Sequence, residues 1–244
     1  MSLNDPQTTN IRREIILSKP FLKRLYQEWY SLIGSCFSRD DQVLELGSGA
    51  GFLNESLPGT ISTDLISTTH VDLVADSQYM PINTSSLDGV VMTDVMHHIG
   101  DCSLFLHEVV RVVKPGGKLV MIEPWNTRWS KFFYQNFHHE PFEPDATTWK
   151  VSGAGPLSDA NGAIPWIVFE RDIELFRSRF PEWQLVSVKP MMPFSYILSG
   201  GVSLRSLLPG WMYPFVRLIE SKLDQRSWAM FAFIVLERTL HEPI

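Results

Sequence analysis

Residues 42–52, Gln-Val-Leu-Glu-Leu-Gly-Ser-Gly-Ala-Gly-Phe, decide the fold of this chain. The apolar run Val43–Leu46 is typical of a buried parallel strand, and it ends at Gly47. Three glycines at alternate positions then let the backbone pass close under a ligand and present N–H groups where a helix begins. A dinucleotide-binding fingerprint would place Gly or Ala at the position of Phe52. The stretch therefore predicts a ligand-binding strand-to-helix turn that departs from the NAD-binding pattern.

Short apolar runs alternate with amphipathic stretches along the rest of the chain. We expect strands over residues 42–46, 60–64, 71–75, 87–93, 118–122, 183–188 and 229–236. We expect helices over residues 11–37, 52–57, 103–113 and 172–179. This alternation predicts an α/β, Rossmann-like, doubly wound, mostly parallel sheet with helices on both faces. No clear sheet-crossing helix separates the last two strands, so one of them is expected to run antiparallel at the C-terminal end.

Charge is distributed unevenly along the sequence. The chain has 21 Lys+Arg against 27 Asp+Glu, a net charge of −6, yet residues 40–108 contain eleven acids and no Lys or Arg. This acidic balance argues against a protein that binds nucleic acid by neutralising phosphates. Two cysteines without a CxxC spacing, and no apolar run of the roughly 18 residues that span a bilayer, favour a cytoplasmic protein.

Two acids follow predicted strands in positions that suit ligand binding. Asp64 ends the second strand, where a carboxylate can accept both hydroxyls of a ribose or can cap a helix. Asp76 follows the third strand, where it can accept from an adenine amino group or form a turn. Together with the glycine turn they lie at the carboxyl ends of adjacent strands, where open α/β sheets bind ligands.

Five segments occur in a diagnostic order: VLELGSGAG (43–51), TD (63–64), ADSQYMP (75–81), LDGVVMTDVMHH (87–98) and VVRVVKPGGKLV (109–120). Over roughly residues 42–123 they resemble class I S-adenosylmethionine (SAM)-dependent methyltransferases, most closely the small-molecule, type 11-like branch. The resemblance implies SAM as the cofactor and methyl transfer to a small or lipid-linked acceptor. Oxygen, nitrogen and carbon acceptors all remain open, and oxygen is favoured because histidine bases are available. SAM brings a sulfonium and an ammonium but no phosphate, which suits the acidic stretch.

The resemblance also implies which residues bind the cofactor. Gly47 and Gly49 would pack under its methionyl part, and Asp64 would hold the ribose. Asp76 would hold the adenine, and Asp94 with its strand neighbour would face the amino group and the sulfonium. The full predicted set is Glu45, Gly47, Ser48, Gly49, Asp64, Leu65, Ala75, Asp76, Ser77, Thr93 and Asp94.

The pattern of strands and helices predicts one domain with two insertions over residues 1–244, and the resemblance suggests what its parts do. An N-terminal helical segment, 1–39, would precede a cofactor-binding core, 40–123. Two aromatic, proline-rich insertions, 124–170 and 190–226, are predicted to form an acceptor lid. The first could instead form a satellite core, and the second a dimer contact or, with basic residues of the N-terminal helix, a peripheral membrane contact. Too few residues separate strands two and three for a crossover helix, so a loop should build the adenine side.

An oxygen acceptor calls for a general base, and histidine suits neutral pH. The predicted catalytic residues are His98 and His139, with His97, His138 and Glu140 as further candidates. His97 is more simply a packing residue. No metal is expected, because adjacent histidines on a helix point apart and do not form a ligand pair.

Two other function classes remain open at this point. A catalytically silent methyltransferase-like module could serve as an interaction or membrane-surface scaffold, although such a module need not retain the glycine turn and the acids. A nucleotide-dependent oxidoreductase is disfavoured by Phe52 and by the lack of a nearby arginine for a ribose phosphate.

Overall fold

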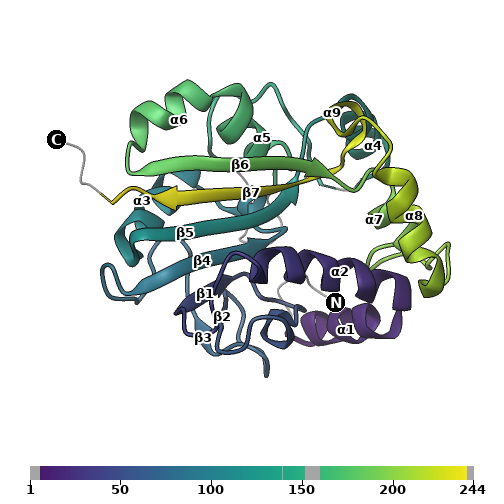
Figure 1. Ribbon diagram of the computed structural model, residues 1–244, viewed down its shortest axis with the longest axis horizontal. Helices are drawn as coiled ribbons and strands as arrows, with labels where there is room; N and C mark the ends of the chain where they lie inside the picture. Colours follow the sequence, from purple (N-terminus) through teal and green to yellow (C-terminus); the bar gives the residue numbers. More distant parts are fainter. Residues whose placement is uncertain (1–5, 139, 152–159, 241–244) are drawn as a thin grey trace.

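The computed structural model describes residues 6–138, 140–151 and 160–240. Within these ranges seven strands form one sheet in the order β3-β2-β1-β4-β5-β7-β6 (Figure 1). Their bounds are β1 Val43–Leu46, β2 Ile61–Asp64, β3 Leu73–Val74, β4 Leu87–Thr93, β5 Val113–Pro124, β6 Trp183–Met191 and β7 Phe231–Arg238. Strands β1 to β5 pair in parallel, whereas β7 runs antiparallel to both β5 and β6. The predicted mostly parallel sheet with an antiparallel C-terminal strand is confirmed.

Helices cover both faces of the sheet, with α1 and α2 on one face and α3, α5 and α6 on the other (Figure 1). The helices are α1 Pro6–Ser18, α2 Pro20–Gly34, α3 Cys102–Val112, α4 Arg128–Phe137, α5 Ile164–Trp166, α6 Ile173–Arg179, α7 Ser195–Ser199, α8 Tyr213–Glu220 and α9 Gln225–Trp228. Short 3-10 turns lie at η1 Leu53–Glu55, η2 Met96–His98 and η4 Gly210–Met212, and a π-helical turn at η3 Ile167–Arg171. None of the helices in the described ranges is long and apolar enough to cross a bilayer.

Two expected helices differ from the structure. The helix expected over 11–37 is two helices, because Pro20 starts α2 and holds Lys19 in an extended conformation (φ −100°, ψ 100°). The helix expected over 52–57 is only the turn η1. Residues 65–72, all within the described ranges, hold no helix, so a loop joins β2 to β3 as expected.

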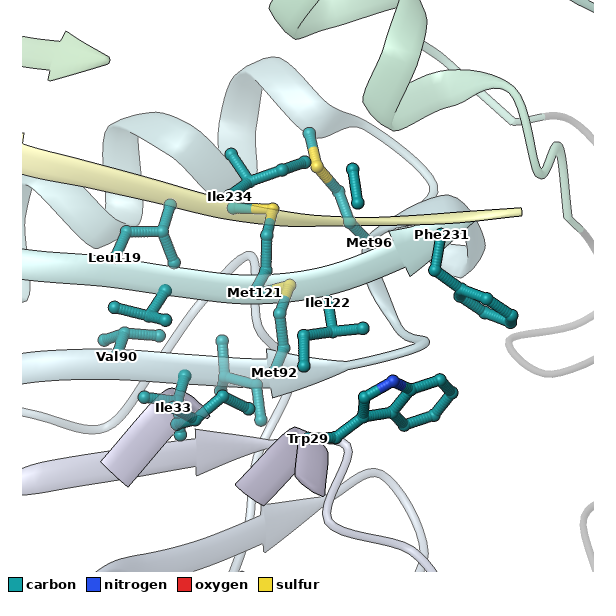
Figure 2. Packing of buried hydrophobic residues seen from close by; sticks show 14 of the residues in the cluster. Trp29, Ile33, Val90, Met92, Met96, Leu119, Met121, Ile122, Phe231 and Ile234 are labelled. Atoms are coloured by element: carbon teal, nitrogen blue, oxygen red, sulfur yellow. The ribbon is translucent and has the colours of Figure 1, made fainter. Parts of the chain in front are cut away.

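The main core lies between α2 and the centre of the sheet (Figure 2). Trp29 and Ile33 of α2 are fully buried, as are Met92 of β4 and Met121 of β5. The Trp29 ring lies 4.9 Å from the ring of Phe231 in β7, so α2 packs across several strands. Burying each such side chain contributes about 1.5–3 kcal/mol. This packing fixes α2 over the carboxyl ends of the strands.

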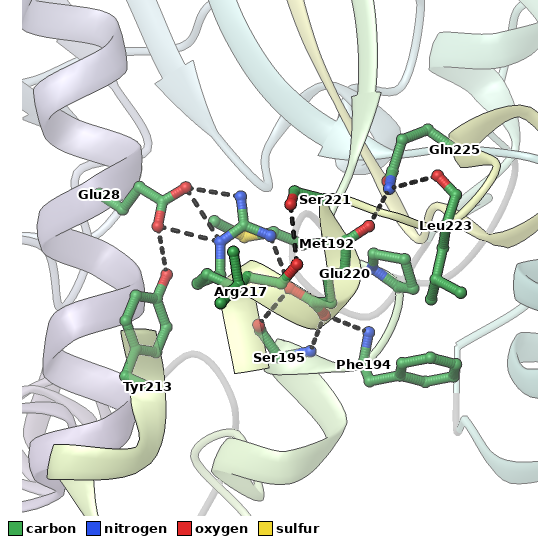
Figure 3. Close-up of polar contacts among 12 residues, drawn as sticks. Glu28, Met192, Phe194, Ser195, Tyr213, Arg217, Glu220, Ser221, Leu223 and Gln225 are labelled. Carbon is green, nitrogen blue, oxygen red and sulfur yellow. Dashed lines mark hydrogen bonds and ion pairs between the residues drawn. The ribbon is translucent and has the colours of Figure 1, made fainter. Parts of the chain in front are cut away.

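A buried ion network joins α2 to the segment that follows β6 (Figure 3). Glu220 of α8 is fully buried and accepts hydrogen bonds from the backbone N–H groups of Phe194 and Ser195, at 2.6 Å each. Arg217 lies 2.5 Å from the Glu220 carboxylate and 2.7 Å from that of Glu28 in α2. A buried charge needs such partners, because desolvation costs several kcal/mol per ion. The network therefore holds α7 and α8 against the N-terminal helices.

We expect Glu220→Ala to lower the free energy of unfolding by about 3–5 kcal/mol, because it leaves Arg217 and two backbone N–H groups without this carboxylate. Urea unfolding followed by circular dichroism measures the loss. Glu174→Ala is the matched control, since Glu174 pairs with Arg177 across one helical turn but is 82% exposed. Exposed ion pairs of this kind contribute little to the free energy of unfolding. Equal losses in the two variants would contradict the role assigned to the network.

Candidate functional site

A cavity of about 1270 Å³ lies at the carboxyl ends of β1, β2 and β4. Its sheet-side wall contains all eleven residues predicted to bind a cofactor: Glu45, Gly47, Ser48, Gly49, Asp64, Leu65, Ala75, Asp76, Ser77, Thr93 and Asp94. The opposite wall comes from α1, α2, α4 and residues 196–204. Segments from Thr9 to Phe231 of the sequence therefore meet around one space.

The glycine turn after β1 follows a path that larger residues would obstruct. Gly47 has φ +62°, and a Cβ there would lie 2.6 Å from Cγ2 of Val95. Gly49 has φ +42°, and its N–H donates to Oδ2 of Asp64 at 2.9 Å. Positive φ costs little only for glycine. The turn is thus held tightly against the ends of β2 and β4.

The two acids after β2 and β3 are oriented by backbone groups. Oδ1 of Asp64 accepts from the N–H of Ile66 at 3.0 Å, while its other oxygen accepts from the glycine turn. Oδ1 of Asp76 accepts from the N–H of Gln78 at 2.8 Å. Both carboxylates therefore have fixed directions at the cavity wall, and each keeps further lone pairs available to a ligand.

Glu45 is a buried carboxyl group at the end of β1, with only 4% of its surface exposed. Burial raises its pKa to about 8, the charge of Asp64 adds to the rise, and Arg13 opposes it. A desolvated carboxyl group of this kind is stabilised in its ionised form by a cation placed beside it.

Asp94 leaves β4 in the left-handed region, at φ +62°, and lines the same cavity. About a third of its side-chain surface is exposed, and the residue forms part of the cavity wall. Burial raises the pKa of Asp94 to about 7; His97 opposes the rise, whereas Glu123 and Glu140 add to it. The cavity thus holds a second carboxyl group whose ionisation a bound cation would favour.

A fully buried carboxylate, Glu123 at the end of β5, organises the turn after β4. Its Oε1 accepts from the N–H groups of Val95 and Met96, at 2.8 Å each. Its Oε2 lies 2.8 Å from Nδ1 of His97. Because the carboxylate can only accept, we assign a proton to this ring nitrogen, which leaves Nε2 facing the other way.

Nε2 of His97 faces a second carboxylate. It lies 3.6 Å from Oε2 of Glu140, and Nε2 of the neighbouring His98 lies 3.8 Å from Oε1. Burial alone would lower the pKa of His97, but the Glu123 and Glu140 carboxylates outweigh it and raise the pKa well above its usual value. Burial likewise opposes ionisation of Glu140, yet the three nearby histidines lower its pKa to about 2. The segment that follows α4 is thereby fixed to the turn after β4.

Of the two predicted catalytic residues, His98 lines the cavity, whereas His139 lies outside the described residues. His97, expected as a packing residue, is indeed buried but also carries the ion pairs described above. Sequence reasoning missed Glu123, although an acid directly after the fifth predicted strand is the same signal that drew attention to Asp64.

Basic residues of the N-terminal segment have partners inside the protein. Arg12 lines the cavity, Arg13 donates to the carbonyl of Gly51, and Lys19 donates to the carbonyl of Gly201 at 2.7 Å. These three residues therefore lie at the inner side of the N-terminal helices, where α1 and α2 line the site.

Comparison with known proteins identifies the core of the chain. Residues 44–121 match the family model of the methyltransferase domain. The chain carries a class I, SAM-dependent methyltransferase domain. The match spans the glycine turn, both acids after β2 and β3, and the turn after β4. No curated protein matches the chain.

Solved structures share the fold of this methyltransferase at low sequence identity. A chain from the complex of the Haloferax volcanii Trm112 methyltransferase activator with its proposed methyltransferase is 13% identical, with TM-score 0.57 and 100% of both chains covered. Geranyl diphosphate C-methyltransferase from Streptomyces coelicolor is 12% identical, with TM-score 0.54, covering 97% of this chain and 85% of that one. A SAM-dependent methyltransferase from Thermotoga maritima is 13% identical, with TM-score 0.50 and coverage of 93% and 99%.

The chemistry of the cavity fits the cofactor of this methyltransferase family. At Gly47 the space that a Cβ would need is filled by the Val95 side chain, so only glycine lets the turn lie this close to the end of β4. Two carboxyl groups with raised pKa values, the buried Glu45 and the partly buried Asp94, suit a ligand that carries positive charge.

Glu45→Gln should make the stability of the methyltransferase less dependent on pH. Folding raises the pKa of Glu45 from 4.5 to about 8. The stability gained from the protonated group is therefore complete below the unfolded pKa and is lost as pH rises through the folded pKa. Relative to wild type, Glu45→Gln should gain at least about 1 kcal/mol between pH 5 and pH 9, since one pKa unit is worth about 1.4 kcal/mol.

Urea unfolding of both proteins at the two pH values measures this difference. Glu55→Gln, at an exposed glutamate of the turn η1, is the control and should follow wild type. A wild-type pH dependence retained in Glu45→Gln would contradict the raised pKa.

Proposed function

We propose that this enzyme transfers the methyl group of SAM to an oxygen atom of a small or lipid-linked acceptor. The observation that carries the proposal is the single cavity that joins all eleven cofactor candidates to an aromatic wall. Its volume of about 1270 Å³ exceeds the roughly 300–1000 Å³ of most ligand sites. That volume leaves room for an acceptor beside the cofactor. The core 40–123 would bind the cofactor, and segments 124–170 and 190–226 would form the acceptor lid.

The cofactor residues would act by binding and orienting. Asp64 would hold the ribose, Asp76 and the backbone of Ser77 the adenine, and the glycine turn the methionyl part. Glu45 and Asp94 would stabilise the two positive charges of the ligand. SAM supplies a methyl group already activated on a sulfonium, so the remaining work of the protein is alignment and exclusion of water.

Transfer to oxygen is supported by the basic groups at the cavity wall. His98 lines the cavity 3.8 Å from the Glu140 carboxylate. It would accept the proton of the acceptor hydroxyl as the oxygen attacks the methyl carbon. His139 remains a second candidate for the same role.

An apolar groove next to the cavity supports a lipid-linked acceptor. The groove has a volume of about 530 Å³ and is lined by Trp129, Phe132, Phe133, Phe137, Phe194, Ile197, Leu198, Val216, Ile219 and Glu220. Phe133, Phe137 and Ile197 also line the main cavity. An acceptor could thus place its polar end near His98 and its apolar chain along the groove.

Exposed apolar side chains near the groove support delivery of that acceptor from a membrane surface. The large exposed apolar residues of this region are Leu204, Leu207, Trp211, Phe215, Leu218 and Ile219. Such a cluster is characteristic of contact with a membrane or with another protein. A homodimer would cover the same surface, and a dimer contact is therefore the alternative to a membrane contact.

Binding of S-adenosylhomocysteine (SAH) tests the cofactor half of the proposal. We expect Gly47→Ala to weaken SAH binding at least tenfold, because the new Cβ collides with Val95 beside the cofactor. Isothermal titration calorimetry measures the affinity. Gly59→Ala is the control, since Gly59 also has a positive φ, +88°, but open space around it. Equal effects would assign the loss to backbone strain alone and contradict a role for the turn.

Transfer of labelled methyl groups tests the acceptor half. The enzyme is incubated with isotope-labelled SAM and with either aqueous metabolites or lipid extracts in anionic vesicles, and the label is followed by mass spectrometry. We expect label in the lipid fraction, co-sedimentation of the enzyme with vesicles, and a several-fold loss of transfer in Phe137→Ala, because Phe137 lines both the groove and the cavity.

SAH binding to Phe137→Ala should remain at the wild-type level and is the internal control. Label only in water-soluble products would contradict the lipid-linked acceptor. A stable dimer that does not co-sediment with vesicles would contradict the membrane contact. Binding of SAM without label in any fraction would favour the silent module.

A further inference from the structure

We propose that His97, His98 and Glu140 form a binding site for a divalent transition-metal ion in the wall of the cavity. One ligand atom from each residue lies within 4.8 Å of those of the other two. The two Nε2–carboxylate distances are 3.6 and 3.8 Å. Ligand atoms at about 2.1 Å from a tetrahedral ion are about 3.4 Å apart. Small side-chain shifts would therefore bring the three ligands onto one ion.

The surroundings of His97 are those of a metal-binding imidazole. Glu123 is fully buried and engages Nδ1 at 2.8 Å, which fixes the ring and directs Nε2 toward Glu140. Metal-binding histidines usually donate their second nitrogen to a carboxylate in this way, which orients the ring and raises its basicity. Glu123 in turn accepts hydrogen bonds from two backbone N–H groups, so the carboxylate that orients His97 is itself fixed in position.

The ligand set selects the type of ion. Two imidazoles and one carboxylate suit Zn²⁺, Co²⁺ or Fe²⁺, whereas Mg²⁺ and Ca²⁺ prefer oxygen ligands. Three protein ligands leave a coordination position for water or substrate. His98 and Glu140 line the cavity, so we expect that position on the cavity side. Asp94 lies beside it, with Oδ1 4.0 Å from Nε2 of His97.

The site departs from the expectation of no metal, which considered only the adjacent His138 and His139. The ligands instead come from two segments more than 40 residues apart, joined by the fold. A role in catalysis rests on the proposed function: with the ion bound, His98 would act as a ligand and not as the base, and the ion would bind and orient the acceptor oxygen and make its hydroxyl more acidic. Occupancy of the site does not depend on that role.

Metal titration of the full chain, stripped of metal beforehand, tests the site. We expect one Zn²⁺ or Co²⁺ per chain by calorimetry, with visible absorption bands from Co²⁺ and no comparable binding of Mg²⁺. His98→Ala and Glu140→Gln should each weaken binding at least tenfold, and Glu123→Gln about 10–100-fold. His70→Ala is the control, because His70 is exposed and does not line the cavity. It should bind as wild type.

SAH binding to each variant shows whether the fold and the cofactor site are intact. Metal affinity lost with SAH affinity retained supports the site. Failure of all ions to bind, or wild-type affinity in both His98→Ala and Glu140→Gln, overturns it and leaves the cluster as a structural ion pair. Metal binding without methyl transfer would contradict the proposed function and not the metal site.

Discussion

One buried carboxylate, Glu123, holds the turn on which the site depends. It accepts both N–H groups of Val95 and Met96 and engages His97, so the chain can leave β4 sharply. That exit places Asp94 in a left-handed conformation at the cavity wall. A buried carboxylate without partners would cost several kcal/mol. Here the polar groups of the turn supply those partners, so the carboxylate and the turn stabilise each other.

The other wall of the cavity depends on contacts between the two ends of the chain. Lys19 donates to the carbonyl of Gly201, and the Trp29 ring stacks on that of Tyr196 with centroids 6.3 Å apart. The ion pair between Glu28 and Arg217 adds a charged link. Since the same segments line the cavity, the packing that stabilises the N-terminal helices also sets the shape of the space for an acceptor.

The sequence alone was sufficient to predict the mostly parallel sheet and the residues that form one wall of the cavity. Parallel strands bring their carboxyl ends to one edge, so local motifs such as the glycine turn and Asp64 could be placed together without a structure. Pro20 indicates the break between α1 and α2, because proline favours the first turn of a helix and interrupts a helix interior. The spacing of apolar residues alone predicted one continuous helix there. Glu140 could not be placed beside His97, because the loop that carries it follows no strand-end rule and is positioned only by tertiary contacts.

The acidic stretch illustrates the same difference between local and tertiary information. Of its eleven acids, four line the cavity, and Arg12 lines it as well. Others serve elsewhere: Asp72 accepts from Ser62, Asp88 pairs with Lys114, Asp101 with Lys150, and Glu108 with Arg111. Net charge along the sequence therefore exaggerates the negative charge of the site. The stronger argument for a cationic ligand is local: burial raises the pKa values of Glu45 and Asp94, so a bound cation would stabilise both in their ionised form.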